Sequence, residues 1–165
     1  MIIKNGLVFQ EDGTFAPKDI YIHKGKIVSS ESETEDKSVY DAQGMKVLPG
    51  LVDIHSHGAF GHDFCDADPE GLKEILRYEK SHGITSYCPT SMTLSKERLL
   101  EIFSSVKDME TSSDMARIAG INMEGPFVDV KKKGAQAAEH ICPPDPEFFR
   151  LCNERCGNIL KLVTL

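Results

Sequence analysis

The stretch at residues 47–58, V-L-P-G-L-V-D-I-H-S-H-G, constrains the fold most, because a short apolar run ends there in two histidines. Side chains at i and i+2 of a β-strand point to the same face, so His55 and His57 can converge at the carboxyl end of a strand. Gly58 then lets the chain turn away without a Cβ in its path. Two imidazoles in this arrangement suit a metal ion, and a pair of surface histidines is the simpler alternative.

From residue 51 onwards, apolar strands alternate with amphipathic helices. After the first strand we expect strands at residues 84–88, 117–123 and 159–165, with Pro89 ending the first of these three. Each expected helix follows a capping residue, namely Asp68, Ser95 or Asp145. Strands that alternate with helices of this length indicate β-α-β units, a parallel sheet and the α/β class.

Residues 1–48 indicate short strands and turns, so we divide the chain into a β-rich part at 1–48 and an α/β part at 49–165. Asn5-Gly6 is a strong signal for a two-residue hairpin turn, and Gly25 allows a second turn. Residues 39–48 are expected to form a further strand pair.

Charge and cysteine content limit the function and the compartment. The formal net charge is −7, from 26 acidic and 19 basic residues, which argues against a nucleic-acid partner held through phosphate contacts. No apolar run approaches the ~20 residues of a membrane span, so no membrane partner is expected. Five cysteines without a C-x-x-C pair favour a reducing compartment, so we expect a cytoplasmic protein. The one basic run, Lys131–Lys133, either forms a solvated loop or attracts an anionic ligand through its positive charge.

Three segments carry a family resemblance: PGLVDIHSHG at 49–58, HGITSYCPTSMT at 82–93 and GINMEGPFVDVKKKGAQ at 120–136. Together they resemble the amidohydrolase superfamily and, within it, the N-acetylglucosamine-6-phosphate deacetylases. The resemblance implies a (β/α)8 TIM barrel, of which 49–165 would be the first half, with 1–48 as part of a small β-sandwich. A whole barrel takes about 250 residues. This chain would therefore be the amino-terminal portion only, inactive alone.

The same resemblance implies the activity and the site. The enzyme would remove acetate from N-acetylglucosamine 6-phosphate, a small sugar phosphate, to give glucosamine 6-phosphate. His55, His57 and Glu124 would bind a divalent metal, Zn or Fe, as one or two ions. Ala135 and Gln136 would contact substrate, although an ordinary loop is the alternative. The general-base aspartate would lie beyond Leu165, so no catalytic residue is assigned within the chain.

Several alternatives stay open. Another amidohydrolase, dihydropyrimidinase-like or adenine deaminase-like, would share H-x-H without needing EGPF and KGAQ. A non-catalytic fragment could keep the metal site for structure alone. His62, in the loop after the first strand, is a weaker candidate for contact with metal or substrate. Half a barrel leaves two open sheet edges, so we also expect self-association into a homo-oligomer.

Overall fold

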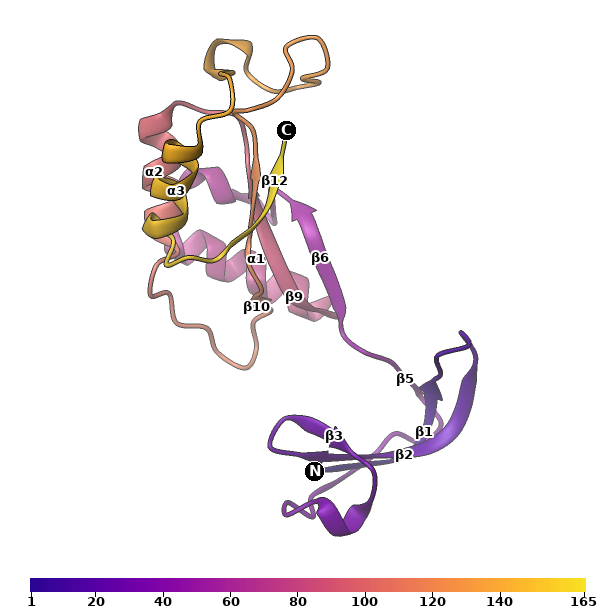
Figure 1. Ribbon diagram of the computed structural model, residues 1–165. Helices are drawn as coiled ribbons and strands as arrows, with labels where there is room; N and C mark the ends of the chain where they lie inside the picture. Colours follow the sequence, from indigo (N-terminus) through magenta and orange to yellow (C-terminus); the bar gives the residue numbers. More distant parts are fainter. The chain divides into compact units, whose positions relative to one another are not determined.

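The computed structural model describes all residues from 1 to 165, and the chain divides into two units, Met1–Pro49 and Gly50–Leu165. The first unit is a single five-stranded sheet around β1 (Ile2–Phe9), drawn in indigo in Figure 1. β2 (Phe15–His23) pairs antiparallel with β1, and β3 (Lys26–Val28) extends β2; η1 (Glu31–Glu33) follows as a short 3-10 turn. The strand pair expected at 39–48 forms differently, because β4 (Val39–Asp41) and β5 (Lys46–Val47) both run parallel to β1.

The hairpin predicted at Asn5-Gly6 is wrong, because β1 runs straight through these residues. Asn5 has a φ of 58°, and the register with β2 shifts between Ile3 and Gly6. The left-handed preference that suits asparagine to a tight turn here produces a bulge inside a strand. The turn expected at Gly25 is confirmed, since the β2–β3 hairpin closes through Lys24 and Gly25 with φ values of 48° and 75°.

The second unit is built on a parallel sheet, which confirms the α/β class. Its main strands are β6 (Leu51–Ser56), β9 (Ile84–Ser91), β11 (Ile121–Glu124) and β12 (Leu160–Thr164), paired in that order. The single strand expected at 117–123 is split, because β10 (Arg117–Ile118) pairs with β9 separately from β11. A small ribbon of β7 (Gly58–Ala59) and β8 (His62–Asp63) follows β6.

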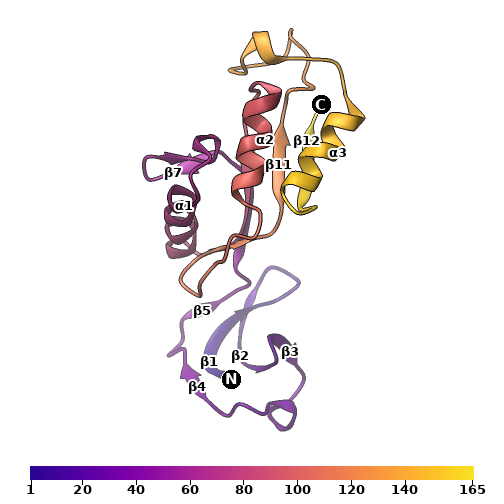
Figure 2. The ribbon, with the colours of Figure 1, turned by 90° about the vertical axis from the view of Figure 1, so that its left-hand side faces the viewer.

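Three helices cover one face of this sheet, as Figures 1 and 2 show together: α1 (Pro69–Ser81), α2 (Lys96–Ser105) and α3 (Pro146–Arg155). The predicted capping residues Asp68, Ser95 and Asp145 all accept a backbone N–H of the helix that follows. Two 3-10 turns, η2 (Phe64–Asp66) and η3 (Ala138–His140), lie in the loops. None of the helices combines the length and the apolar character that a membrane span requires.

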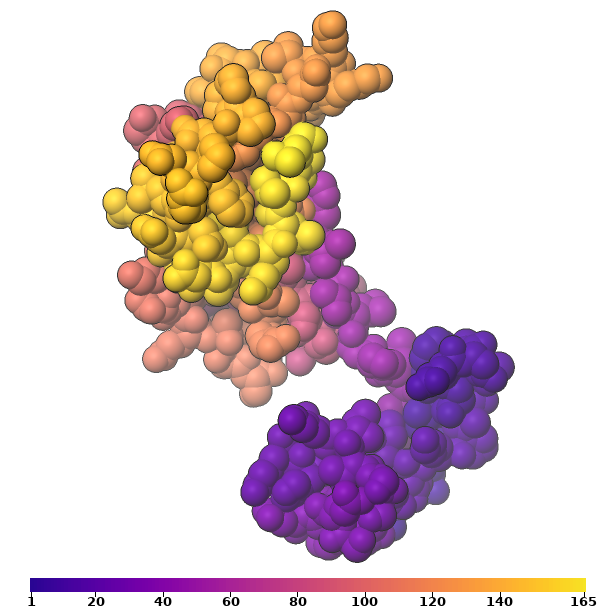
Figure 3. Space-filling model, viewed as in Figure 1, coloured from indigo at the N-terminus to yellow at the C-terminus, as the bar shows by residue number.

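The core of this unit lies between the helices and the sheet. Its fully buried side chains include Ile75, Leu76, Tyr87, Leu99, Ile102, Phe103, Ile121 and Met123. β6 and β12 each pair on one side only, so they are the two edges of the sheet. Leu51, Val52 and Ile54 of β6 are more than half exposed, and Figure 3 shows this violet segment at the surface of the unit.

The prediction that Pro89 ends its strand is wrong, because β9 continues to Ser91. Proline lacks only its own N–H, and the two residues after it pair with β11 in register. On the β6 side, the N–H of Ser56 donates to the Thr90 hydroxyl at 3.2 Å. A side chain therefore replaces a backbone acceptor at this point of the ladder.

The Asp145 carboxylate is expected to make the stability of the fold depend on pH in the acid range. The bond from Lys96 Nζ to Asp145 Oδ2 at 2.7 Å, and then the N–H of Phe148, hold the pKa of this carboxyl below its usual range. A lowered pKa in the folded state stabilises the fold above the ordinary carboxyl pKa of about 4, and this contribution is lost as the pH falls further. Asp145→Asn keeps a good cap without the charge. Denaturation midpoints at pH 6 and pH 3 should therefore differ less for Asp145→Asn than for the wild type, and an equal difference would contradict this.

Candidate metal centre

His55, His57 and Glu124 come together at the carboxyl ends of β6 and β11, two strands separated by β9. One donor atom from each lies within 4.8 Å of the others. Glu124 Oε2 is 2.8 Å from His55 Nε2 and 3.2 Å from His57 Nε2. The carboxyl end of β6 is the upper end of that strand in Figure 1. The cluster predicted from H-x-H and EGPF therefore has the geometry of one shared site.

The ring of His57 is held by the backbone of β9. Its Nδ1 lies 3.0 Å from the carbonyl oxygen of Thr90. A carbonyl only accepts, so Nδ1 carries the proton and, in the neutral ring, Nε2 presents its lone pair. That lone pair faces a carboxylate oxygen of Glu124. Two acceptors 3.2 Å apart repel each other unless a cation or a proton lies between them, so the arrangement fits a bound cation.

The donor set also matches particular metals. Two imidazole nitrogens and one carboxylate oxygen suit Zn²⁺ or Fe²⁺ better than Ca²⁺ or Mg²⁺, which prefer oxygen ligands alone. The side chain of His55 is half exposed, whereas that of Glu124 is 19% exposed. The site is therefore built into the sheet on the Glu124 side and open on the His55 side, where further ligands or substrate can approach.

The backbone after Glu124 is fixed by a glycine. Gly125 has a φ of +72°, and a Cβ at this position would lie 1.9 Å from the hydroxyl oxygen of Thr93. Thr93 is itself buried in the loop after β9. Only glycine combines this backbone conformation with this close approach. The glycine of EGPF therefore sets how the chain leaves the metal cluster.

The two residues predicted to contact substrate lie in the loop after β11. Gln136 is buried, and its side-chain oxygen accepts the N–H of Thr93 at 2.7 Å, while its amide nitrogen lies 3.7 Å from the sulfur of Met92. Ala135 beside it is exposed. The side chain of Gln136 thus joins this loop to the one after β9. Substrate contact by Ala135 and Gln136 stays a prediction.

The other titratable candidates lie outside the cluster. His62 packs over Gly71 of α1, where a Cβ would come 2.8 Å from the ring Nδ1. Asp63 caps η2 by accepting the N–H of Cys65. Two site-supporting residues escaped sequence reasoning, Thr90 and Asn122, which bond to the backbone of β6. Their only signal in the sequence is a polar side chain within a strand.

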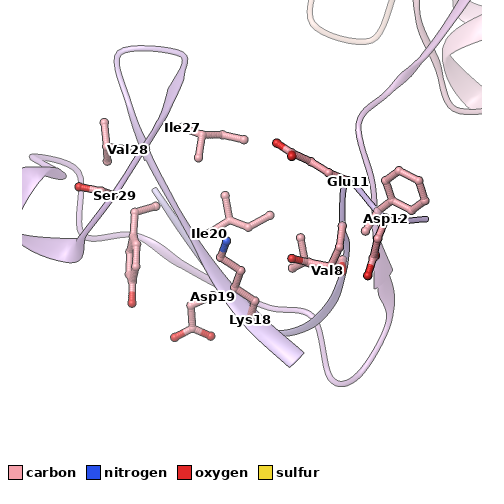
Figure 4. A pocket seen from close by; sticks show the side chains of 12 residues that line it. Val8, Glu11, Asp12, Lys18, Asp19, Ile20, Ile27, Val28 and Ser29 are labelled. Atoms are coloured by element: carbon pink, nitrogen blue, oxygen red, sulfur yellow. Dashed lines mark hydrogen bonds between the residues drawn. The ribbon is translucent and has the colours of Figure 1, made fainter. Parts of the chain in front are cut away.

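A hollow of about 740 Å³ in the first unit offers no comparable donor set. Figure 4 shows its apolar centre, with Val8 and Ile20, and charged side chains such as Glu11 and Lys18 nearby. Its lining contains neither histidine nor cysteine. The cluster at β6 and β11 therefore remains the candidate site.

The whole chain resembles known proteins, although no protein-family model matches it. An N-acetylglucosamine-6-phosphate deacetylase of Bacillus subtilis (strain 168) is 31% identical over 173 residues, covering 100% of this chain and 44% of that protein. The crystal structure of such a deacetylase from Thermotoga maritima matches with a TM-score of 0.70 and 30% identity, over 92% of this chain and 39% of that one.

A mutant of the Mycobacterium smegmatis deacetylase, in complex with N-acetyl-D-glucosamine-6-phosphate, matches with a TM-score of 0.80. At 21% identity this likeness shows the fold alone; it covers 100% of this chain and 43% of that one. The chain therefore spans less than half the length of the relatives that it matches.

Proposed function

Since the chain is homologous over its whole length to the amino-terminal portion of the N-acetylglucosamine-6-phosphate deacetylases, we propose that it supplies the metal-binding part of such an enzyme. The reaction is hydrolysis of the acetamide of N-acetylglucosamine 6-phosphate, giving acetate and glucosamine 6-phosphate. The convergence of His55, His57 and Glu124 is the observation that carries this proposal.

The residues of this chain would divide the work as follows. Glu124 provides the negative charge, and His57, with its tautomer set by Thr90, provides a nitrogen lone pair. His55 holds the exposed side, and its backbone N–H donates to Asp53 Oδ1 at 2.8 Å. A divalent ion bound here would polarise the amide carbonyl and lower the pKa of water.

The finer parts of the proposal follow the family resemblance. The metal would be Zn²⁺ or Fe²⁺, and the loop with Ala135 and Gln136 would contact the sugar phosphate. The neighbouring Lys131 and Lys132 are exposed and add positive charge to that loop. Assembly into a homo-oligomer and a cytoplasmic location belong to the same proposal.

A chimeric enzyme tests the proposed reaction. The matching segment of the Bacillus subtilis relative is replaced by residues 1–165 of this chain, and acetate release from N-acetylglucosamine 6-phosphate is measured with Zn²⁺ or Fe²⁺. The chimera should release acetate, and the 165-residue chain alone should not, because the resemblance places the general base elsewhere. Glu124→Gln in the chimera should reduce release to background, whereas Glu139→Gln, in an exposed turn, should not.

Circular dichroism and metal content separate the ways in which the chimera can fail. A folded chimera that binds metal yet releases no acetate would contradict the deacetylase assignment. If the chimera and the 165-residue chain both fold and neither binds divalent metal, the proposed metal centre itself is wrong.

A further inference from the structure

Asn122 connects the two strands that carry the metal cluster. It lies on β11, two residues before Glu124, and its side-chain nitrogen donates to the carbonyl oxygen of Ile54 at 3.0 Å. Ile54 directly precedes His55 on β6. β6 and β11 are not neighbours, because β9 lies between them, so this bond spans the intervening strand.

The β6 backbone needs such a partner at this point. Its register with β9 shifts between Asp53 and Ser56, so the regular ladder is interrupted where the histidines begin. Side chains replace the missing backbone partners: Asn122 bonds to the carbonyl of Ile54, and Thr90 accepts the N–H of Ser56. The path of the H-x-H backbone is therefore set by a side chain of β9, which lies beside β6, and by one of β11, which lies on the far side of β9.

The amide of Asn122 is poorly explained by stability alone. The residue is 5% exposed, and its side-chain oxygen has no hydrogen-bond partner. An unpaired buried oxygen costs free energy and offsets part of what the bond to the Ile54 carbonyl contributes, so stability is a weak reason for an amide at this position. A flipped amide would set oxygen against the Ile54 carbonyl, so the nitrogen must face it.

From these contacts we propose that Asn122 is a positioning residue for the metal centre. It holds the peptide before His55 at a fixed place relative to Glu124 on its own strand, so that the donors of the two strands meet. The inference rests on the proposed metal centre, and it adds a residue that would act on the ligands without touching the ion.

Asn122→Leu tests the inference in the full 165-residue chain. Titration with Zn²⁺ should show a dissociation constant raised about 10- to 100-fold, the usual effect of losing a partner that orients a ligand. The absorption spectrum of bound Co²⁺ should also change, since it reports the geometry of the donors. The denaturation midpoint in a chelator should fall no further than that of Asn153→Leu, because each variant loses one bond from an amide to strand backbone and Asn122→Leu also removes an unpaired buried oxygen.

Asn153→Leu is the matched control. Asn153 Oδ1 accepts the N–H of Leu160 at 3.1 Å, so it too binds strand backbone through its amide, but on β12. This variant should lower the denaturation midpoint and leave Zn²⁺ affinity unchanged. Asn122→Ala is made alongside Asn122→Leu, in case the branched side chain does not fit.

The outcomes separate this inference from the proposal beneath it. If the wild-type chain binds Zn²⁺ and both Asn122 variants bind it equally well, the positioning role is overturned and the metal centre stands. If neither variant folds, the role is also overturned, because Asn122 would then serve folding. If the wild type binds no metal, the proposed metal centre is wrong, and the positioning role of Asn122 is then wrong as well.

Discussion

Replacing Glu124 by glutamine is expected to abolish tight binding of divalent metal by this chain. Oε2 of Glu124 is the atom that both histidine Nε2 atoms face, at 2.8 and 3.2 Å. Glutamine keeps the shape of the side chain and removes its negative charge, so the ion would lose its anionic ligand. Zn²⁺ affinity, measured by calorimetry, should fall on the order of 100-fold or more, beyond the effect of an indirect partner.

Glu139→Gln provides the control for this experiment. Glu139 lies in η3, is exposed and is not part of the cluster. Its replacement changes the net charge by the same amount and should leave Zn²⁺ affinity as in the wild type. If Glu124→Gln binds Zn²⁺ as tightly as Glu139→Gln, Glu124 is not a ligand and the proposed centre is wrong.

Gly125→Ala is expected to cause a large loss of stability. The added Cβ would meet the Thr93 hydroxyl oxygen at 1.9 Å, and a φ of +72° is itself unfavourable for alanine. Overpacking of a buried site costs about 1–3 kcal/mol, and the left-handed backbone costs roughly 1–2 kcal/mol. The free energy of unfolding, from urea denaturation, should therefore fall by about 3 kcal/mol. Because Glu124 is the preceding residue, Zn²⁺ affinity should fall as well.

Gly134→Ala is the control that separates the cost of the left-handed backbone from the cost of the steric contact with Thr93. Gly134 has a φ of +58°, and a Cβ there would meet nothing within 4 Å. This variant carries the backbone penalty alone, so it should lose about 1 kcal/mol. Equal losses for the two variants would show that the contact with Thr93 is relieved at no cost, contrary to the expectation.

Local signals in the sequence predicted much of the second unit. Asp68, Ser95 and Asp145 cap the helices as expected, because a cap depends on residues within one turn of helix. The wrong predictions concern places where pairing with strands distant in the sequence decides the structure. Asn5-Gly6 has the local chemistry of a hairpin, but β4 and β5 pair with β1 on either side of it and keep the strand continuous. Pro89 stays within β9 because its neighbours still pair with β11.

The same distinction applies to the site. The i, i+2 spacing of His55 and His57 was enough to predict their convergence, and the EGPF resemblance added Glu124. The contacts of Thr90 and Asn122 with β6 could not be predicted, because they depend on the register between strands. The partner of Gln136 is likewise set by how two loops meet, 43 residues apart in the chain.

The position of the cluster also links metal affinity to the folding of the second unit. His55 and Glu124 are 69 residues apart in sequence, with β9 and two helices between them. An ion held by both residues acts as a cross-link that closes this long loop and reduces the conformational entropy of the unfolded chain. The free metal concentration would then help to determine how much of this unit is folded, as any ligand specific for the native state does.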